Sequence, residues 1–148
     1  MAVLIDNQQA RHPLNIETVR KKAQAVLSAL GSPDGELSVV LVDDVRIARL
    51  NQDYLQRQGP TNVIAFSMRE GAYNEINPHL LGDVVISMET CAREAQQAGM
   101  LITHRFDQLL IHGILHIFGY DHVQTAAEAR RMDAKAEALL AILNQDEP

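Results

Sequence analysis

The stretch of residues 109–118 limits the possible folds more than any other part of the sequence. It is apolar on nearly every side of a helix, apart from His112 and His116. A helix that is apolar all round must be buried on most of its faces, so other elements have to surround it. We therefore expect a central buried helix, with Thr103 as its N-cap.

The rest of the chain alternates between short apolar runs and amphipathic segments. Strands are expected at residues 2–5, 37–42, 62–67 and 81–88. Four further helices are expected. Two of them end at Gly31 and near Gly99. The other two begin at a cap formed by Asp43 or Asp44, and at the capping box of Thr125 and Glu128. In the helix capped by Asp43 or Asp44, the residues expected to face the core are Ile47, Leu50 and Tyr54. This pattern predicts an α+β fold, with roughly four strands in a mixed sheet and about five helices.

Composition and charge narrow the class of protein. With 148 residues and 47% hydrophobic content, the chain fits a single domain over residues 1–148. No apolar run approaches the ~18 residues of a membrane span, and no export signal is evident, so a cytoplasmic protein that does not bind membranes is expected. The net charge of −6 argues against a broad nucleic-acid surface, although local basic patches remain possible.

The histidines of the central helix have a spacing that suits a metal ion. His112 and His116 are four residues apart, so both imidazoles lie on one helix face and can converge on one ion. Gly119 can end the helix in the left-handed conformation, which lets the chain turn back and supply His122 as a third ligand. Three protein ligands leave a fourth position for water, which zinc activates near neutral pH. The sequence therefore predicts one catalytic zinc ion per chain.

Two alternatives to a catalytic zinc site remain open. The histidines could be ordinary core or loop residues, although burying two unpaired imidazoles side by side is costly. The metal could also only stabilise the fold, but structural zinc usually has four protein ligands. The single cysteine, Cys91, belongs to a different predicted helix and is expected to be a small buried apolar residue.

The histidine spacing matches the metal-binding positions of the metzincin protease signature, H-E-x-x-H-x-x-G-x-x-H. However, Gly113 occupies the position of the catalytic glutamate, so peptidase activity is disfavoured. Asp121, next to His122, is the nearest carboxylate. It could act as a general base or orient a ligand, or it could simply form the turn after Gly119.

Residues 112–122 resemble the signature of the YbeY family, H-G-x-L-H-x-x-G-Y-D-H, at every fixed position. Residues 60–66 (PTNVIAF) and 81–87 (LGDVVIS) resemble two further family stretches in the expected order. The resemblance implies a zincin-like α+β fold and zinc on the three histidines. It also implies cleavage of single-stranded RNA in small-subunit ribosomal RNA maturation and ribosome quality control. The implied partners are ribosomal RNA, ribosomal particles, a small-subunit ribosomal protein and an assembly GTPase.

Two positions depart from the family pattern. The family places an arginine directly after a tyrosine that precedes the Pro-Thr stretch, but Leu55 follows Tyr54 here. Arg57 is the candidate replacement, because its guanidinium could stabilise charge on a phosphate, and the alternative is a solvated cation at a helix end. Ser67 stands where the family usually has proline, which changes backbone geometry more than chemistry.

Three functions are compatible with these observations. The leading one is a metal-dependent endoribonuclease, in which either water or the ribose 2′-hydroxyl attacks the phosphate. The second is a zinc metallohydrolase that acts on a peptide or a small molecule. The third is a ribosome-assembly binding module in which zinc has only a structural role.

Overall fold

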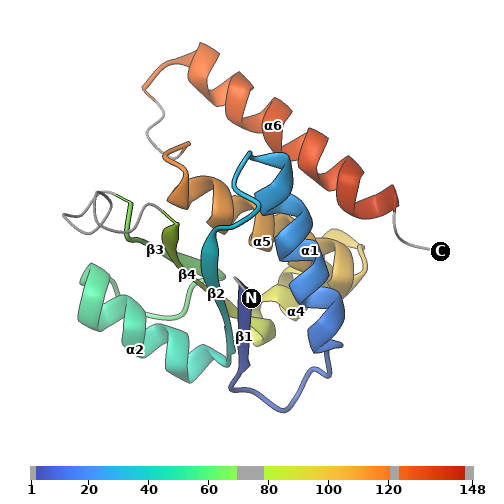
Figure 1. Cartoon of the computed structure of the whole chain (residues 1–148). Helices are drawn as coiled ribbons and strands as arrows, with labels where there is room; N and C mark the ends of the chain where they lie inside the picture. Colours follow the sequence, from blue (N-terminus) through green and yellow to red (C-terminus); the bar gives the residue numbers. More distant parts are fainter. Residues whose placement is uncertain (1–2, 70–78, 121–123, 146–148) are drawn as a thin grey trace.

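A computed structural model describes residues 3–69, 79–120 and 124–145 (Figure 1). Its four strands are β1 (Val3–Asn7), β2 (Glu36–Val42), β3 (Val63–Ser67) and β4 (Leu80–Ser87). The helices in the described residues are α1 (Ile16–Ala29), α2 (Asp44–Leu55), α4 (Met88–Ala98), α5 (Ile102–Ile117) and α6 (Ala126–Gln145). The predicted α+β class is confirmed. The extent of the single domain stays a prediction.

The four strands form one mixed sheet in the order β1-β2-β4-β3. The first three pair in parallel, and β3 pairs antiparallel with β4 at the edge of the sheet. Side chains alternate between the two faces, as a pleated strand requires. On β2, for example, Val39 and Leu41 face the main core, whereas Val40 and Val42 face a smaller cluster on the other side.

Helices cover the two faces of the sheet unequally (Figure 1). On one face, α1 and α5 pack against the strands and build the main core, with α4 beside α5 and α6 outside α5 and α1. The other face is covered by α2 through a cluster of four buried residues, which are Val42, Ile47, Ile64 and Val85. No helix in the described residues is long and apolar enough to cross a membrane.

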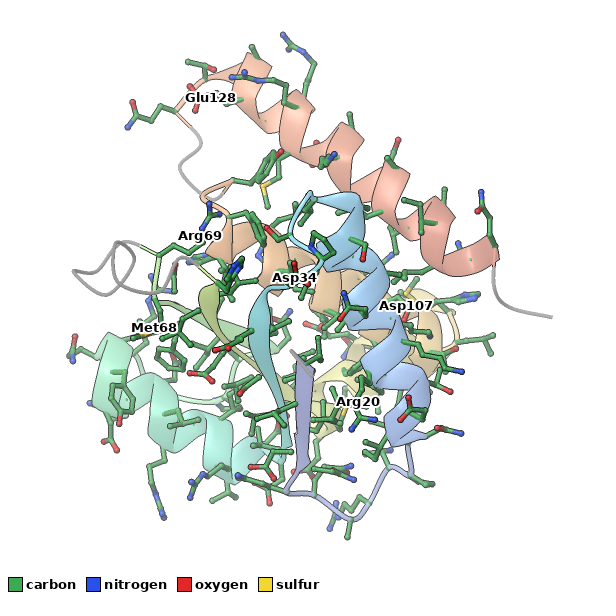
Figure 2. The ribbon with its side chains drawn as sticks, viewed as in Figure 1. Arg20, Asp34, Met68, Arg69, Asp107 and Glu128 are labelled. Carbon is green, nitrogen blue, oxygen red and sulfur yellow. The ribbon has the colours of Figure 1, made fainter. Side chains whose placement is uncertain are left out.

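The predicted central buried helix is confirmed as α5. It touches β3, β4, α1, α4 and α6, and most of its side chains from Phe106 to Ile117 are buried. Even Asp107 is buried, where Lys22 of α1 donates a hydrogen bond to its carboxylate at 2.9 Å (Figure 2). This pair fixes α1 to the side of α5 that faces away from the solvent.

Several local predictions at helix ends are confirmed. The carboxylate of Asp43 caps α2 by accepting a hydrogen bond from the Arg46 backbone N–H at 2.9 Å. At the start of α6, the Thr125 hydroxyl oxygen accepts a hydrogen bond from the Glu128 N–H at 3.1 Å, and the Glu128 carboxylate accepts one from the Thr125 hydroxyl. The first contact is the expected N-cap, and the pair at α6 is a variant of the capping box, in which the Glu128 carboxylate binds the Thr125 hydroxyl and the Gln124 N–H.

Two side-chain predictions are wrong. Thr103 is not the N-cap of α5, because the helix already begins at Ile102 and Leu101 takes the cap position without a side-chain hydrogen bond. Tyr54 is 63% exposed rather than buried. The buried residues of α2 are Ile47 and Asn51, whose amide donates a hydrogen bond to the Gly59 carbonyl. Tyr54 lies two turns after Ile47 on the same face, but in the last turn of the helix, where its ring packs edge-on against Phe66 at 5.5 Å and stays largely exposed.

Candidate metal centre

His112 and His116 lie on the accessible side of an otherwise buried helix. His112 is exposed and His116 is half-buried, whereas Ile111, Leu115 and Ile117 between and beside them are buried. Four residues correspond to about one helical turn, so the two imidazoles leave α5 in nearly the same direction. The core thus holds the backbone rigidly, while both imidazoles lie on the accessible side of the helix.

Gly113 fixes the distance between α5 and the sheet. A Cβ atom at this position would lie 2.6 Å from a methyl carbon of Val84 and 3.2 Å from one of Val63. Real carbon atoms do not approach to 2.6 Å, so any larger residue would have to displace the Val84 side chain or the elements that carry it. The position that bears a glutamate in metzincins therefore has no space for one here. The close packing of Gly113 against Val84 thus explains why this position lacks the carboxylate that serves as the base in a peptidase.

The C-terminal end of α5 turns back as expected from Gly119. This glycine has φ of +89°, its N–H donates to the His116 carbonyl, and the Tyr120 N–H donates to the Leu115 carbonyl. Such paired bonds at a left-handed residue end a helix and reverse the chain direction. Residues 121–123 follow directly and lie outside the described residues. The positions of Asp121 and His122 therefore stay predictions.

Two of the three proposed ligands can be tested against the geometry. Within residues 3–69, 79–120 and 124–145, no three His, Cys, Asp or Glu side chains are grouped closely enough to hold a metal. The pair His112 and His116, followed by the reversal at Gly119, fits a zinc site that takes its third ligand from the next residues. One helix bears both of the predicted ligands that the structure describes, so their spacing is set by the helix itself.

Cys91 is a buried apolar residue, as predicted. It is fully buried on α4, and burial raises the pKa of its thiol to about 12. Zinc binds the thiolate form, which this surrounding disfavours. Cys91 is therefore unsuited to complete a four-ligand structural site.

Arg57 lies in the loop that follows α2, and its side chain is exposed. Its backbone N–H donates to the Asn51 carbonyl at 3.2 Å, and the Asn51 amide donates to the Gly59 carbonyl at 3.0 Å. The loop backbone is thus held while the guanidinium forms no ion pair with any described residue. This arrangement suits either a phosphate contact or a solvated cation, so the role of Arg57 stays a prediction.

A polar network that the sequence patterns missed brings the start of β3 to the histidine side of α5. The Glu94 carboxylate accepts hydrogen bonds from the Asn62 amide at 3.2 Å and from the Arg105 guanidinium at 3.0 and 3.1 Å. Arg105 precedes His112 by seven residues, about two helical turns, so both side chains leave the same side of α5. The loop containing Arg57 therefore ends, at Asn62, near the side of α5 that bears Arg105 two turns before His112, and the position of the Arg57 guanidinium relative to the histidines stays a prediction.

Arg69 is a second residue that the sequence analysis missed. The Ser67 hydroxyl donates to the Ile117 carbonyl at 3.4 Å, and the Arg69 N–H donates to the Ser67 hydroxyl oxygen at 3.2 Å. The Arg69 guanidinium carbon lies 4.6 Å from the centre of the Phe118 ring, at the end of α5 (Figure 2). This cation–π contact joins the end of β3 to the turn after His116. No periodicity marks a residue just after a strand, so no sequence signal predicted it.

Comparison with known proteins gives a consistent result. A family model described as endoribonuclease YbeY matches residues 4–144. A protein of Geobacter metallireducens named endoribonuclease YbeY is 52% identical over 147 residues, which cover 99% of this chain and 98% of that protein. Its namesake from Geobacter sulfurreducens is 52% identical over 144 residues, covering 97% and 96% of the two chains.

The fold is similar to a solved structure. The solution structure of TM1509 from Thermotoga maritima matches with a TM-score of 0.68 over 95% of this chain and 88% of that chain, at 22% sequence identity. This likeness concerns the fold alone. The match over residues 4–144 and the identity of 52% to two relatives, in contrast, define the family. The chain belongs to the endoribonuclease YbeY family.

Proposed function

We propose that this protein is a zinc-dependent endoribonuclease that cleaves single-stranded RNA at a metal held by His112, His116 and His122. The observation that supports it most is the pair of accessible imidazoles on a buried helix, followed by the chain reversal at Gly119. Membership of the endoribonuclease YbeY family supplies the class of substrate. By family resemblance, the substrate is the precursor of small-subunit ribosomal RNA, and the role includes ribosome quality control. The partners are ribosomal particles, a small-subunit ribosomal protein and an assembly GTPase.

The chemistry divides between the ion and the side chains. Zinc, when bound, supplies a Lewis acid and lowers the pKa of its water. The imidazoles of His112 and His116 hold it at a fixed spacing, because Gly113 seats their helix directly on β3 and β4. Arg57 pairs with a phosphate oxygen and stabilises charge as the bond breaks. Asp121 acts as general base or orients a ligand. The cleavage product identifies the attacking nucleophile, because a 2′,3′-cyclic phosphate forms only when the ribose 2′-hydroxyl attacks.

Peptide hydrolysis is the less favourable hydrolase function. A zinc peptidase of the metzincin type needs a carboxylate at position 113 to activate its water. Val84 and Val63 occupy the space that this side chain would need. The same contacts do not disturb the approach of a phosphodiester to the accessible imidazoles.

The experiment measures zinc content and RNA cleavage in the same preparations. The parent and a His79→Ala control should contain about one zinc per chain, whereas the His112→Ala/His116→Ala double variant should lose nearly all of it. His79 is exposed and outside the proposed site, so the control removes a histidine without removing a ligand. Full zinc occupancy in the double variant would refute the site.

Cleavage is measured on matched single-stranded and duplex RNA, with and without a chelator. The parent should cleave the single strand, stop when the metal is removed and resume when zinc is restored. A zinc-loaded protein that cleaves no RNA but hydrolyses a peptide would support the second hydrolase function. Binding of ribosomal particles that survives loss of both histidines, with no cleavage by the parent, would support a binding module instead.

A further inference from the structure

A surface hollow of about 670 Å³ lies between the end of α5 and one face of α6. Phe118, Gly119 and Tyr120 form one wall. The other wall consists of residues at helical spacing on α6, which are Glu128, Arg131, Ala134, Lys135 and Ala138. The volume lies within the range of pockets that enclose a small organic ligand. We call this feature the α5–α6 hollow.

The α6 wall of the hollow presents two cations. Arg131 and Lys135 are one turn apart, and neither forms an ion pair with any residue that the structure describes. The single acidic side chain among the described lining residues, Glu128, accepts hydrogen bonds from Thr125 and from the Gln124 N–H within the capping box. Its carboxylate is therefore held at the start of α6, and two positive charges remain to attract an anion.

The α5 wall presents aromatic rings. One face of the Phe118 ring is occupied by the Arg69 guanidinium at 4.6 Å, which adds a third positive charge close to this wall. Tyr120 is half-buried, so part of its ring borders the hollow. Cations beside a partly exposed aromatic surface are a combination that binds single-stranded nucleic acid, because phosphates pair with the cations and bases stack on the ring.

The hollow is connected to the proposed metal site through the chain itself. Phe118 and Tyr120 follow His116 by two and four residues and flank the reversal at Gly119, and Tyr120 precedes the predicted ligand His122 by two residues. A nucleotide bound in the hollow would therefore lie on the same turn that positions the metal ligands. Figure 2 shows Arg69 beside this end of α5 and Glu128 on the first turn of α6.

We propose that the α5–α6 hollow is a substrate subsite, where Arg131 and Lys135 bind phosphates of single-stranded RNA and Tyr120 stacks against a base next to the cleaved bond. This inference rests on the proposed function and adds the place where the RNA outside the reacting phosphate is held. It also gives a reason for selecting single strands, because a duplex keeps its bases paired and stacked, away from Tyr120.

The test compares two double variants with equal charge. Arg131→Ala/Lys135→Ala removes both cations of the hollow. Lys21→Ala/Arg130→Ala removes two cations that are exposed and do not line the hollow. Thermal unfolding of both proteins verifies that the substitutions leave the fold intact. Any difference between them then reports the position of the charge and not the net charge.

Binding is measured by fluorescence anisotropy with zinc-loaded protein and a labelled 2′-O-methyl oligouridine, whose integrity is checked on a gel. Arg131→Ala/Lys135→Ala should weaken binding about tenfold or more and lower the slope of log affinity against log salt by about 1, the scale for one to two phosphate contacts to a single strand. In cleavage of unmodified RNA, KM should rise while kcat stays close to the parent value. The single variant Tyr120→Leu should bind the oligouridine about tenfold more weakly than the parent, whereas Tyr120→Phe should keep the affinity of the parent.

Equal affinities and salt slopes for the two double variants would overturn the subsite. If the parent cleaves RNA and this equality is found, the proposed function stands and only the hollow is refuted. If the parent binds the oligouridine through Arg131 and Lys135 but does not cleave RNA, the subsite is supported and the proposed function is refuted.

Discussion

Gly113 provides the sharpest test of how α5 is seated on the sheet. In an unobstructed helix interior, replacing glycine with alanine stabilises a protein by about 1 kcal/mol. At position 113 the new methyl group would lie 2.6 Å from a Val84 methyl carbon, and such overpacking costs roughly 1–3 kcal/mol. The sum predicts that Gly113→Ala lowers the free energy of unfolding by about 0–2 kcal/mol instead of raising it.

A double-mutant cycle in urea isolates the contact between positions 113 and 84. Val84→Ala removes the obstructing methyl groups, so Gly113→Ala should become stabilising in that background, with a coupling energy of about 1–3 kcal/mol. Ala134→Gly, at an exposed position of α6, serves as control for helix propensity and should cost about 1 kcal/mol. A Gly113→Ala variant that is stabilised equally in both backgrounds would refute the close contact. Gly113→Glu should destabilise more strongly, impair RNA cleavage and produce no peptidase activity.

Three further predictions concern single side chains. Arg57→Ala should lower the rate of RNA cleavage about 10²-fold, with zinc content and melting temperature nearly unchanged. Arg57→Lys should recover part of the lost cleavage rate. Cleavage by Arg57→Ala at the parent rate would show that Arg57 is a surface cation. Burial raises the pKa of Asp44, but hydrogen bonds from Ser87, Thr90 and Arg93 outweigh it and hold the pKa below its ordinary value of 3.8. The folded pKa of Asp44 is thus lower than its unfolded pKa. The stability advantage of the parent over Asp44→Asn, measured by urea titration, should therefore be complete above the unfolded pKa and disappear as the pH falls through the folded pKa. A stability advantage that does not change with pH would contradict this. The Cys91 thiol, with its pKa raised to about 12, should react with a disulfide reagent only at the rate of unfolding, and rapid reaction in native buffer would show that it is accessible.

Much of the fold could be predicted because local patterns and tertiary packing agree. Residues 109–118 are apolar on nearly all sides, and α5 is indeed surrounded by strands and helices. Asp43 and the pair Thr125 and Glu128 cap their helices through bonds that span only three residues, which a sequence displays directly. The reversal at Gly119 was likewise predictable, because it needs a backbone conformation that glycine favours.

Contacts between distant residues could not be predicted. Glu94 and Arg105 are ordinary polar helix residues in sequence, and their bonds to each other and to Asn62 depend on where α4 and β3 meet α5. The contact of Arg69 with Phe118 depends on the end of β3 reaching the end of α5. Tyr54 was misplaced for a related reason, because helical spacing alone did not reveal that the last turn of α2 is left largely exposed.

The unequal anchoring of α6 has a consequence for how the protein adapts to different substrates. From Ala126 to Ala138 this helix has no fully buried side chain, and its two buried residues, Leu139 and Leu143, belong to its second half. Segments with few buried contacts open at low energetic cost, whereas α5 is held by the core along most of its length. The wall that bears Arg131 is therefore compliant and the wall next to the histidines is stiff. In the proposed subsite, small movements of α6 would accommodate bases of different size, while the spacing of His112 and His116 would stay constant.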